Sequence, residues 1–340
     1  MAHSIGRRSV IVGGALATLG AAACGGDGRA EDPRRPAPPE PAPGEQPPAP
    51  NVPPEVAKPS GPPGPMPTRE FGKTGVRVTI LGLGGGHAVA DSREIGMQLV
   101  EQAYGQGIRF FDAAPIYNHC QGNYGEVLER RRSSVFLQTK TMARDRDGAL
   151  RELEASLKAM RTDHLDSWLL HDVRRDDEID KILGPGGALE AFTQAVDQKV
   201  VRFIGASCHS TPATLERLIK AHPLDCTIMS LNAAEWYDKP FVPSVLPVAV
   251  EKQMGIIAMK VMGYGELLKA ITPKEALDWA LSLPISVAIV GIHRPTDIDA
   301  NAELARSWKP LSPAQMATIA ERARPVAHAA TFFRRDQWTT

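Results

Sequence analysis

Eight short apolar runs recur along residues 68–340 and alternate with segments of helical period. The runs are Thr79–Leu83, Ile108–Phe111, Val135–Gln138, Leu165–Leu170, Val201–Ala206, Thr227–Leu231, Gly255–Met259 and Val287–Val290. Because each run is continuously apolar rather than alternating, it is typical of a strand buried on both faces of a parallel sheet. Ahead of the first run, Glu70–Val78 predicts two short strands around a Gly-rich turn.

The intervening segments have the period of amphipathic helices. Leu150, Leu153, Leu157 and Met160 recur at spacings of three and four, and Pro212 and Pro273 each mark a helix start. Eight strand–helix units in a segment of this length predict a (β/α)8 barrel. A doubly wound sheet is the alternative, but the glycines of 82–87 lack the final glycine and the acidic partner of a dinucleotide fingerprint.

The first residues are typical of an export signal. Arg7-Arg8 precedes an uncharged run, Ser9–Ala23, which is shorter than the ~20 residues that span a bilayer. The pair resembles a twin-arginine signal, and an ordinary signal with a basic start is the alternative. Cys24 follows small residues as in a bacterial lipobox, although Ala21 replaces the usual Leu; plain cleavage near Ala23 is the alternative.

We therefore expect residues 1–24 to be an export signal with Cys24 lipidated. The protein would be exported across the bacterial inner membrane by the twin-arginine machinery and be periplasmic or membrane-anchored through Cys24. Sixteen of the 29 prolines lie between Pro33 and Pro67. Such a composition predicts that 25–67 is a disordered Pro-rich linker, which leaves 68–340 to form the barrel.

Charge and cysteine content exclude several classes of function. The 39 basic and 39 acidic side chains give a net charge of zero, which removes the usual argument for nucleic-acid binding. The four cysteines are scattered and form no C-x-x-C motif, so neither a zinc ribbon nor an iron–sulfur cluster is predicted. His119 and Cys120 are adjacent but have no nearby partners, so we expect no metal site.

Polar residues at the ends of the apolar runs are the candidates for chemistry. Asp112 directly follows one run, Tyr117 comes five residues later, and Lys140 and His171 come within two residues of the ends of the next two runs. In a barrel these positions meet at one mouth. Singly, each has a structural explanation as a loop cap, an ion pair or a histidine at the core edge. Together they suit proton donation to an oxygen: Asp112 would hold Lys140, whose charge favours the Tyr117 phenolate, and His171 would orient a carbonyl.

Residues 68–325 resemble the aldo/keto reductase family. The matching stretches are Phe71–Gly75, Leu81–Gly84, Gly107–Tyr117, Gln138–Lys140, Leu169–His171, Arg202–Ser207 and the spaced residues Gly291, Pro295, Ile298 and Asn301. The resemblance implies a (β/α)8 barrel that reduces an aldehyde or ketone with a nicotinamide cofactor. It implies the roles given above to Asp112, Tyr117, Lys140 and His171, with Tyr117 as proton donor.

The same resemblance implies a set of cofactor-binding residues. They are Gly85, Gly86 and Asp112 near the cofactor, Ser207 with Cys208 at the nicotinamide amide, Asn232 near the ring, Met259, Lys260 and Gly263 along the pyrophosphate, and Gly291, Arg294 and Asn301 toward the adenosine. We expect NADPH, with NADH as the alternative, because Arg294 would meet a 2′-phosphate whereas Asp297 would repel it.

Several residues depart from the family pattern. Cys208 stands where many members have Asn, Ile228 where many have Gln, and Met259 where a Tyr commonly stacks on the nicotinamide. The stretch 118–124 looks like a substrate-loop insertion, and its Tyr124 is spaced wrongly from Asp112 to be the acid. These departures keep a second hypothesis open, a non-catalytic barrel that binds cofactor or ligand as a tethered sensor or assembly subunit.

Overall fold

The computed structural model describes residues 64–238 and 240–335, and all structural statements below concern these residues. The predicted signal with Cys24, and the predicted linker up to residue 63, lie outside the described residues. Met66 packs into the core and Arg306 Nε donates a hydrogen bond to Gly64 O at 2.9 Å. The predicted boundary between linker and barrel stays a prediction.

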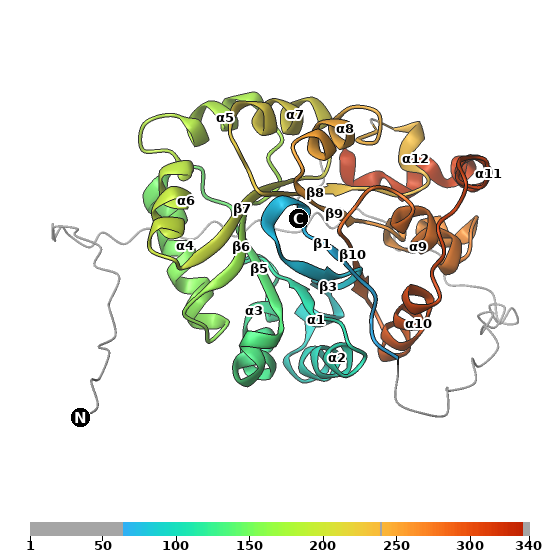
Figure 1. The fold of residues 1–340 in the computed structure, drawn as a ribbon, viewed down its shortest axis with the longest axis horizontal. Helices are drawn as coiled ribbons and strands as arrows, with labels where there is room; N and C mark the ends of the chain where they lie inside the picture. The colour runs from blue at the N-terminus through green and yellow to red at the C-terminus, as the bar shows by residue number, and fades with distance from the viewer. Residues whose placement is uncertain (1–63, 239, 336–340) are drawn as a thin grey trace, which may run out of the picture. The chain divides into compact units, whose positions relative to one another are not determined.

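Eight parallel strands close into a barrel in the order β10-β3-β4-β5-β6-β7-β8-β9, and helices surround it (Figure 1). The strands are β3 (Leu81–His87), β4 (Phe110–Asp112), β5 (Phe136–Thr141), β6 (Leu165–Leu170), β7 (Val201–Cys208), β8 (Cys226–Ser230), β9 (Gly255–Met259) and β10 (Val287–Ile292). Each predicted apolar run overlaps one of these strands, and the (β/α)8 prediction is confirmed.

The helices follow the strands along the chain. They are α1 (Ala88–Asp91), α2 (Arg93–Gly105), α3 (Cys120–Leu128), α4 (Arg146–Ala159), α5 (Asp176–Leu183), α6 (Ala188–Asp197), α7 (Pro212–Ala221), α8 (Val245–Glu251), α9 (Pro273–Leu281), α10 (Pro295–Arg306), α11 (Pro313–Ala323) and α12 (Ala327–Ala330), with short 3-10 turns η1 (Gly72–Thr74), η2 (Glu129–Ser134), η3 (Glu235–Tyr237), η4 (Gly263–Lys269), η5 (Arg324–Val326) and η6 (Phe332–Arg334). The helices predicted to begin at Pro212 and Pro273 do so, since proline suits the first turn of a helix.

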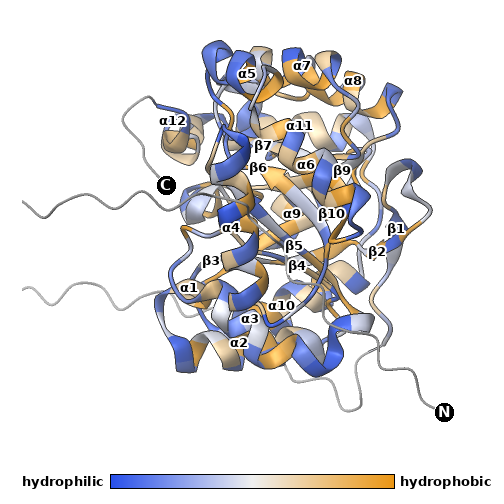
Figure 2. Ribbon diagram, turned by 90° about the vertical axis from the view of Figure 1, so that its left-hand side faces the viewer, coloured by the Kyte–Doolittle hydropathy of each residue, from blue (hydrophilic) through white to orange (hydrophobic). Residues whose placement is uncertain are grey.

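A short hairpin closes the N-terminal end of the barrel. Its strands, β1 (Thr68–Glu70) and β2 (Arg77–Thr79), pair antiparallel, as predicted. Phe71 from its turn is fully buried, and its ring lies 4.8 Å from that of Phe136 at the start of β5. A Cβ on Gly255 would lie 2.7 Å from the Phe71 ring, so the ring can occupy this position only because residue 255 is glycine. Figure 2 shows β1 and β2 on one side of the barrel and α12 on the other.

The inner face of the barrel changes from apolar to polar along the strands. Near the hairpin the interior is apolar: one buried cluster contains Phe71 together with Phe110, Leu169, Ile228 and Ile257. Because side chains alternate along a strand, residues two positions further on face the same interior. On β4 this residue is Asp112, and directly after β6 it is His171. The fold therefore turns these polar side chains toward the C-terminal mouth, where barrel enzymes place their chemistry.

Candidate active site

A buried ion pair joins β4 to β5 at the mouth. Lys140 Nζ donates to Asp112 Oδ1 at 2.6 Å and Oδ2 at 2.8 Å, and to Ala113 O at 2.8 Å. Gln138 Nε2 donates to Asp112 Oδ1 at 2.6 Å, and Ser167 Oγ donates to Gln138 Oε1 at 2.7 Å. Asp112 is 3% and Lys140 2% exposed. Both charges are fully hydrogen-bonded, which is the condition for keeping an ion pair away from water.

Tyr117 lies beside this pair and beside His171. Lys140 Nζ is 5.0 Å from the centre of the Tyr117 ring, and the rings of Tyr117 and His171 are 5.7 Å apart and nearly perpendicular. Burial, and then the charge of Asp112, hold the pKa of Tyr117 well above its usual value. This direction is opposite to the expectation that the charge of Lys140 favours the phenolate; the Lys140 ammonium is bound by both carboxylate oxygens of Asp112. The phenol is therefore protonated at neutral pH, which is the form that a proton donor needs.

The His171 ring is buried and neutral. Neither ring nitrogen has a hydrogen-bond partner among the described residues, although the side chain is 0% exposed. Burial, followed by the charges of Lys140 and Arg144, holds the pKa of His171 well below its usual value. A neutral imidazole carries one N–H donor and one acceptor nitrogen. His171 is thus equipped to hydrogen-bond the oxygen of a bound molecule.

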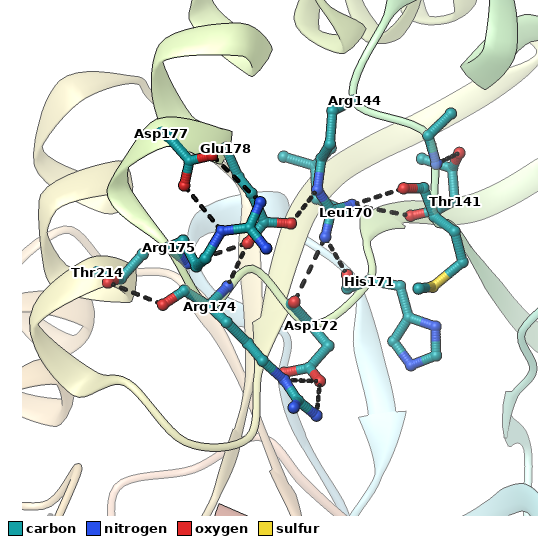
Figure 3. Close-up of polar contacts among 12 residues, drawn as sticks. Thr141, Arg144, Leu170, His171, Asp172, Arg174, Arg175, Asp177, Glu178 and Thr214 are labelled. Atoms are coloured by element: carbon teal, nitrogen blue, oxygen red, sulfur yellow. Dashed lines mark hydrogen bonds and ion pairs between the residues drawn. The ribbon is translucent and has the colours of Figure 1, made fainter. Parts of the chain in front are cut away.

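A polar network fixes the backbone of His171 from outside the mouth (Figure 3). Arg144 Nη2 donates to His171 O at 2.7 Å, and Arg144 Nε pairs with Glu178 at 3.0 Å. Asp172 has a left-handed backbone with φ of 49°, and its carboxylate accepts from Arg174 Nε at 2.6 Å. In Figure 3 the imidazole of His171 points away from this network. Sequence reasoning missed Arg144 and Asp172; the available signal was a charged residue within three positions of the end of a buried strand.

Two of the predicted cofactor residues on β3 differ in their surroundings. A Cβ on Gly85 would collide with Asp112 O and Cys120 Sγ, so this glycine is required by packing against β4 and α3. A Cβ on Gly86 would meet no atom within 4 Å, so its backbone is open to an approaching molecule. Of these two, only Gly86 presents free backbone surface.

Two predicted cofactor residues end β7. Ser207 Oγ accepts from Asp172 N at 2.8 Å and donates to Leu170 O at 3.2 Å, so the protein itself uses this hydroxyl. The Cys208 side chain packs with the outer core and lies 3.4 Å from Thr211 Oγ1. Neither side chain offers a free polar atom to the mouth in this structure.

The predicted cofactor residues after β8 and β9 are also engaged by their neighbours. Asn232 donates to Lys260 O at 3.1 Å and accepts from Ala234 N at 3.0 Å. Met259 lines the apolar interior with Ile228 and Ile257. Burial lowers the pKa of Lys260 to about 7, and its Nζ lies 4.1 Å from the centre of the Tyr264 ring. A Cβ on Gly263 would lie 2.9 Å from Ala330 Cβ, so Gly263 is where η4 packs against α12.

The predicted adenosine side lies at β10 and the start of α10. A Cβ on Gly291 would be 2.6 Å from His87 Cδ2, and the His87 ring is 4.6 Å from that of His293. Burial, then the charge of His293, lower the pKa of His87 to about 4. Arg294 pairs with Asp297 at 2.9 Å within the first turn of α10. The last member, Asn301, is buried in the same helix.

The stretch predicted to be a substrate-loop insertion is instead the start of α3. Gln121 donates to Thr139 Oγ1 and Ser156 Oγ, both at 2.8 Å, and Asn123 donates to Val89 O at 2.8 Å. These buried contacts dock the segment against β5, α4 and α1, which an open loop would not do. Tyr124 is fully buried with its hydroxyl 3.2 Å from Leu83 O, so its role is packing.

Within 64–238 and 240–335, no group of three or more His, Cys, Asp or Glu side chains is placed to hold a metal ion. Burial raises the pKa of the Cys120 thiol well above its usual value, so this cysteine stays an inert thiol at neutral pH. His119 beside it is exposed.

Comparisons with known proteins identify the family of this chain. The model of the aldo/keto reductase family matches residues 81–277, and the chain belongs to this family of oxidoreductases. It is 24% identical over 259 residues to pyridoxal 4-dehydrogenase of Microbacterium luteolum, covering 62% of this chain and 75% of that one. It is also 24% identical over 225 residues to the aldo-keto reductase yakc of Schizosaccharomyces pombe, named for NADP(+), covering 60% of this chain and 64% of that one.

Solved structures show the same fold. An aldo-keto reductase of Bacillus halodurans in its holo form superposes with a TM-score of 0.62 at 19% identity. The match covers 76% of this chain and 96% of that one. At this level of identity the likeness concerns the fold.

Proposed function

We propose that the protein reduces an aldehyde or ketone to an alcohol with a nicotinamide cofactor, with Tyr117 as the proton donor. The observation that supports this proposal most directly is the meeting of three groups at one mouth. They are the protonated Tyr117 phenol, the neutral His171 ring without a hydrogen-bond partner among the described residues, and the buried Asp112–Lys140 pair.

In this proposal a bound nicotinamide cofactor supplies hydride to the carbonyl carbon. The His171 N–H donates a hydrogen bond to the carbonyl oxygen and orients it. As negative charge develops on that oxygen, the Tyr117 O–H bond breaks and the proton moves to the oxygen, which gives the alcohol. The phenolate left behind lies near the Lys140 ammonium, whose charge stabilises it, and takes a proton back from water.

The reacting end of the site fits such a cofactor. The two ring nitrogens of His171 lack partners among the described residues, and the backbone at Gly86 is open. For the adenosine end we propose NADPH rather than NADH, because Arg294 and His293 are exposed cationic or polar groups beside Gly291. Asp297 next to Arg294 favours the alternative, since a carboxylate repels a 2′-phosphate.

A cofactor titration followed by a panel of carbonyl substrates tests the proposal. Quenching of tryptophan fluorescence by NADPH and by NADH measures whether either binds. Oxidation of the bound cofactor on addition of aldehydes and ketones measures turnover. We expect saturable binding and turnover of at least one carbonyl class; binding with no turnover across the panel would contradict the enzyme proposal.

The packing of the adenosine side favours a second candidate function, a barrel that binds ligand without turnover. His87 lies against Gly291, and Arg294 is paired within its own helix. The family resemblance places the adenosine at Gly291 and Arg294. The His87–Gly291 contact and the Arg294–Asp297 ion pair must therefore both change before a dinucleotide can bind there. Turnover in the panel described above would exclude this candidate.

We further propose that the protein is exported through the twin-arginine pathway and anchored by a lipid on Cys24. Arg7-Arg8, the apolar run after it and the small residues before Cys24 support this. Among residues 64–238 and 240–335, no helix combines the length and hydropathy needed to span a bilayer. Replacing Arg7 and Arg8 by Lys should abolish export on cell fractionation, and a mature form that lacks Cys24 would contradict lipidation.

A further inference from the structure

A cavity of about 700 Å³ lies between η3 and the C-terminal segment 324–335. Besides Tyr237 and the carboxylate of Asp238, its described lining has four basic side chains: Arg324, His328, Arg334 and Arg335. None of these is a predicted catalytic or cofactor-binding residue. Guanidinium groups that gather around one cavity are typical of a site for an anion.

Helical spacing and a side-chain contact bring these groups to one place. Arg324 and His328 lie four residues apart along η5 and α12, a spacing that puts side chains on one face of a helix. Arg335 directly follows η6. Thr331 Oγ1 donates to Asp238 Oδ2 at 2.8 Å, which ties the C-terminal segment to the residue after η3. Two segments far apart in the sequence thereby enclose the cavity.

Arg334 forms the buried side of the cavity. It is 2% exposed, pairs with the buried Glu235 and donates a hydrogen bond to Asp238 O. Its charge is thus compensated inside the protein, as a buried guanidinium requires. Arg334 therefore shapes the cavity wall, and a ligand meets the charges of the exposed basic residues.

The two exposed arginines have weaker partners. Arg335 Nη2 donates to His328 O at 2.5 Å and lies 2.9 Å from His328 Nδ1. Arg324 Nη1 lies 3.7 Å from Glu321 Oε2, and the other oxygen of Glu321 accepts from the Tyr237 hydroxyl at 2.9 Å. In the part of the chain that the structure describes, neither guanidinium has a carboxylate within hydrogen-bonding distance. Two positive charges are therefore available to a ligand.

These charges and the size of the cavity define the chemistry of that ligand. A guanidinium binds phosphate oxygens through two parallel N–H groups, and a phosphate monoester carries about −1.5 to −2 charge at pH 7, which matches two arginines. A volume of about 700 Å³ falls in the ~300–1,000 Å³ range of small-molecule sites, so an organic body fits beside the Tyr237 ring. Asp238 and Glu321 oppose an anion, so its affinity should be moderate.

We propose that this cavity binds the phosphate of a small, soluble phosphate monoester through Arg324 and Arg335. The site does not depend on the proposed reduction, and it shares no residue with the candidate active site. It lies close to the mouth all the same. Phe333 of the C-terminal segment has its ring 6.4 Å from that of His209, which directly follows β7. A ligand that joins Arg324 to Arg335 would therefore also hold this segment beside the mouth.

Isothermal titration of the full chain with glycerol 3-phosphate tests the proposal, with glycerol as the uncharged counterpart. Because exposed charges contribute little each, we expect a dissociation constant of roughly 0.1–1 mM for glycerol 3-phosphate and no binding of glycerol. Arg324→Gln and Arg335→Gln should each weaken binding about three- to tenfold, and the double variant should lose it. Both side chains are exposed, so the thermal midpoints of the ligand-free variants should equal that of the parent. Unaltered affinity in both variants, or no binding by the parent, would overturn the proposal.

Arg217→Gln is the matched control, because Arg217 is an exposed arginine on α7 and its loss changes the net charge equally. It should leave the affinity for glycerol 3-phosphate unchanged; a loss equal to that of Arg335→Gln would overturn the site, since binding would follow net charge alone. Binding to phosphatidylglycerol vesicles without binding of glycerol 3-phosphate would overturn the soluble ligand. NADPH affinity should be the same in the parent and both cavity variants. A parallel loss of NADPH affinity would make the cavity part of the cofactor site and overturn the proposal.

Discussion

The two halves of the barrel mouth differ in how their polar groups are satisfied. On the half formed by β4, β5 and β6, the His171 ring is buried without a partner in the described chain, and Tyr117 lies against it. On the half formed by β7 to β10, Ser207 and Arg294 are held by other residues of the protein. The first half therefore has a hydrogen-bonding group that is open to a bound molecule. On the second half, these side chains already have hydrogen-bond or ion-pair partners within the protein.

This difference predicts that separate sets of residues determine the reaction rate and the cofactor affinity. On the first half, the His171 ring gains a hydrogen-bond partner only when a molecule is bound, and Tyr117 lies against it, so removal of these groups should affect the reaction. Groups on the second half must exchange an existing partner for a ligand, so the net gain per contact is small. We therefore expect large effects on rate from the first half and small effects on affinity from the second.

Removal of the Tyr117 hydroxyl should have the largest effect on the rate. Tyr117→Phe keeps the ring against His171 but removes the transferable proton. Because general acid catalysis typically contributes ~10²–10⁴-fold, kcat should fall by at least that range while cofactor affinity stays nearly constant. Steady-state kinetics and fluorescence titration measure the two quantities.

Tyr124→Phe is the control for this substitution. Tyr124 is buried with its hydroxyl near Leu83 O and Asp112 O, so its loss should cost about 1 kcal/mol of stability and leave most of the activity. If Tyr124→Phe were inactive and Tyr117→Phe active, the proton donor would be misassigned.

Breaking the Asp112–Lys140 pair should have the largest effect on stability. Lys140→Met leaves the Asp112 carboxylate buried without its ammonium partner, which typically costs about 3–5 kcal/mol. Urea unfolding of the variant measures this loss, and turnover should be lost as well. The double variant Asp112→Asn, Lys140→Met should recover most of the stability but none of the activity.

An exposed ion pair gives the contrast. Arg217 and Asp180 pair at 2.7 Å on the surface, and both side chains are exposed. Arg217→Met should therefore change the free energy of unfolding by less than about 1 kcal/mol. A loss equal to that of Lys140→Met would show that burial does not distinguish the two pairs.

The fold and the first half of the mouth could be predicted from the sequence, because their signals are local. Continuous apolar runs predicted all eight barrel strands. Asp112 ends β4, Lys140 is the last residue but one of β5, and His171 directly follows β6. The prediction of a loop over 118–124 was wrong, because α3 begins at Cys120. The contacts of Gln121 and Asn123 with β5, α4 and α1 are tertiary and leave no pattern in the segment itself.

The second half of the mouth could not be predicted in the same way. Sequence position places Ser207 at a strand end, but only the structure shows that Asp172, with its left-handed backbone, turns its N–H onto the Ser207 hydroxyl. Which polar groups already have partners is a tertiary property.

The histidines of the mouth should make stability depend on pH. His209 directly follows β7, and its ring lies 6.1 Å from that of His171. Burial holds the pKa values of His171 and His209 well below 6.5, and it lowers that of His87 to about 4. In the unfolded chain these groups take up protons as the pH falls below about 6.5, whereas the folded protein does not. The unfolded state then binds more protons, so these histidines lower the free energy of unfolding as the pH falls below about 6.5 and add no pH dependence well above that value.

His171→Gln should reduce this slope by at most about 1.4 kcal/mol per pH unit, the limit set by one proton. Urea unfolding between pH 7 and pH 5 measures the slope for the parent and the variant. His119→Gln, at an exposed position before α3, should leave it unchanged. An unaltered slope in His171→Gln would show that His171 is not held neutral by its surroundings.

The smallest effect is expected on the adenosine side, at Arg294 and Asp297. The Arg294 side chain is 71% exposed and pairs with Asp297 at 2.9 Å, so it must leave one carboxylate to reach a 2′-phosphate. Exposed pairs contribute ~0–1 kcal/mol, so Arg294→Ala should weaken NADPH relative to NADH by only about three- to fivefold. Asp297→Asn keeps a side chain that caps α10 and removes the repulsion, so it should shift preference toward NADPH by a similar factor.

Titrations of the parent, Arg294→Ala and Asp297→Asn with both dinucleotides measure this preference. Because the charges are exposed, the preference should also shrink as ionic strength is raised. Equal losses of NADPH and NADH affinity in Arg294→Ala, or tighter NADH binding by the parent, would mean that Arg294 does not meet the 2′-phosphate. The half of the mouth formed by β7 to β10 would then bind the dinucleotide through groups other than those that the family resemblance implies.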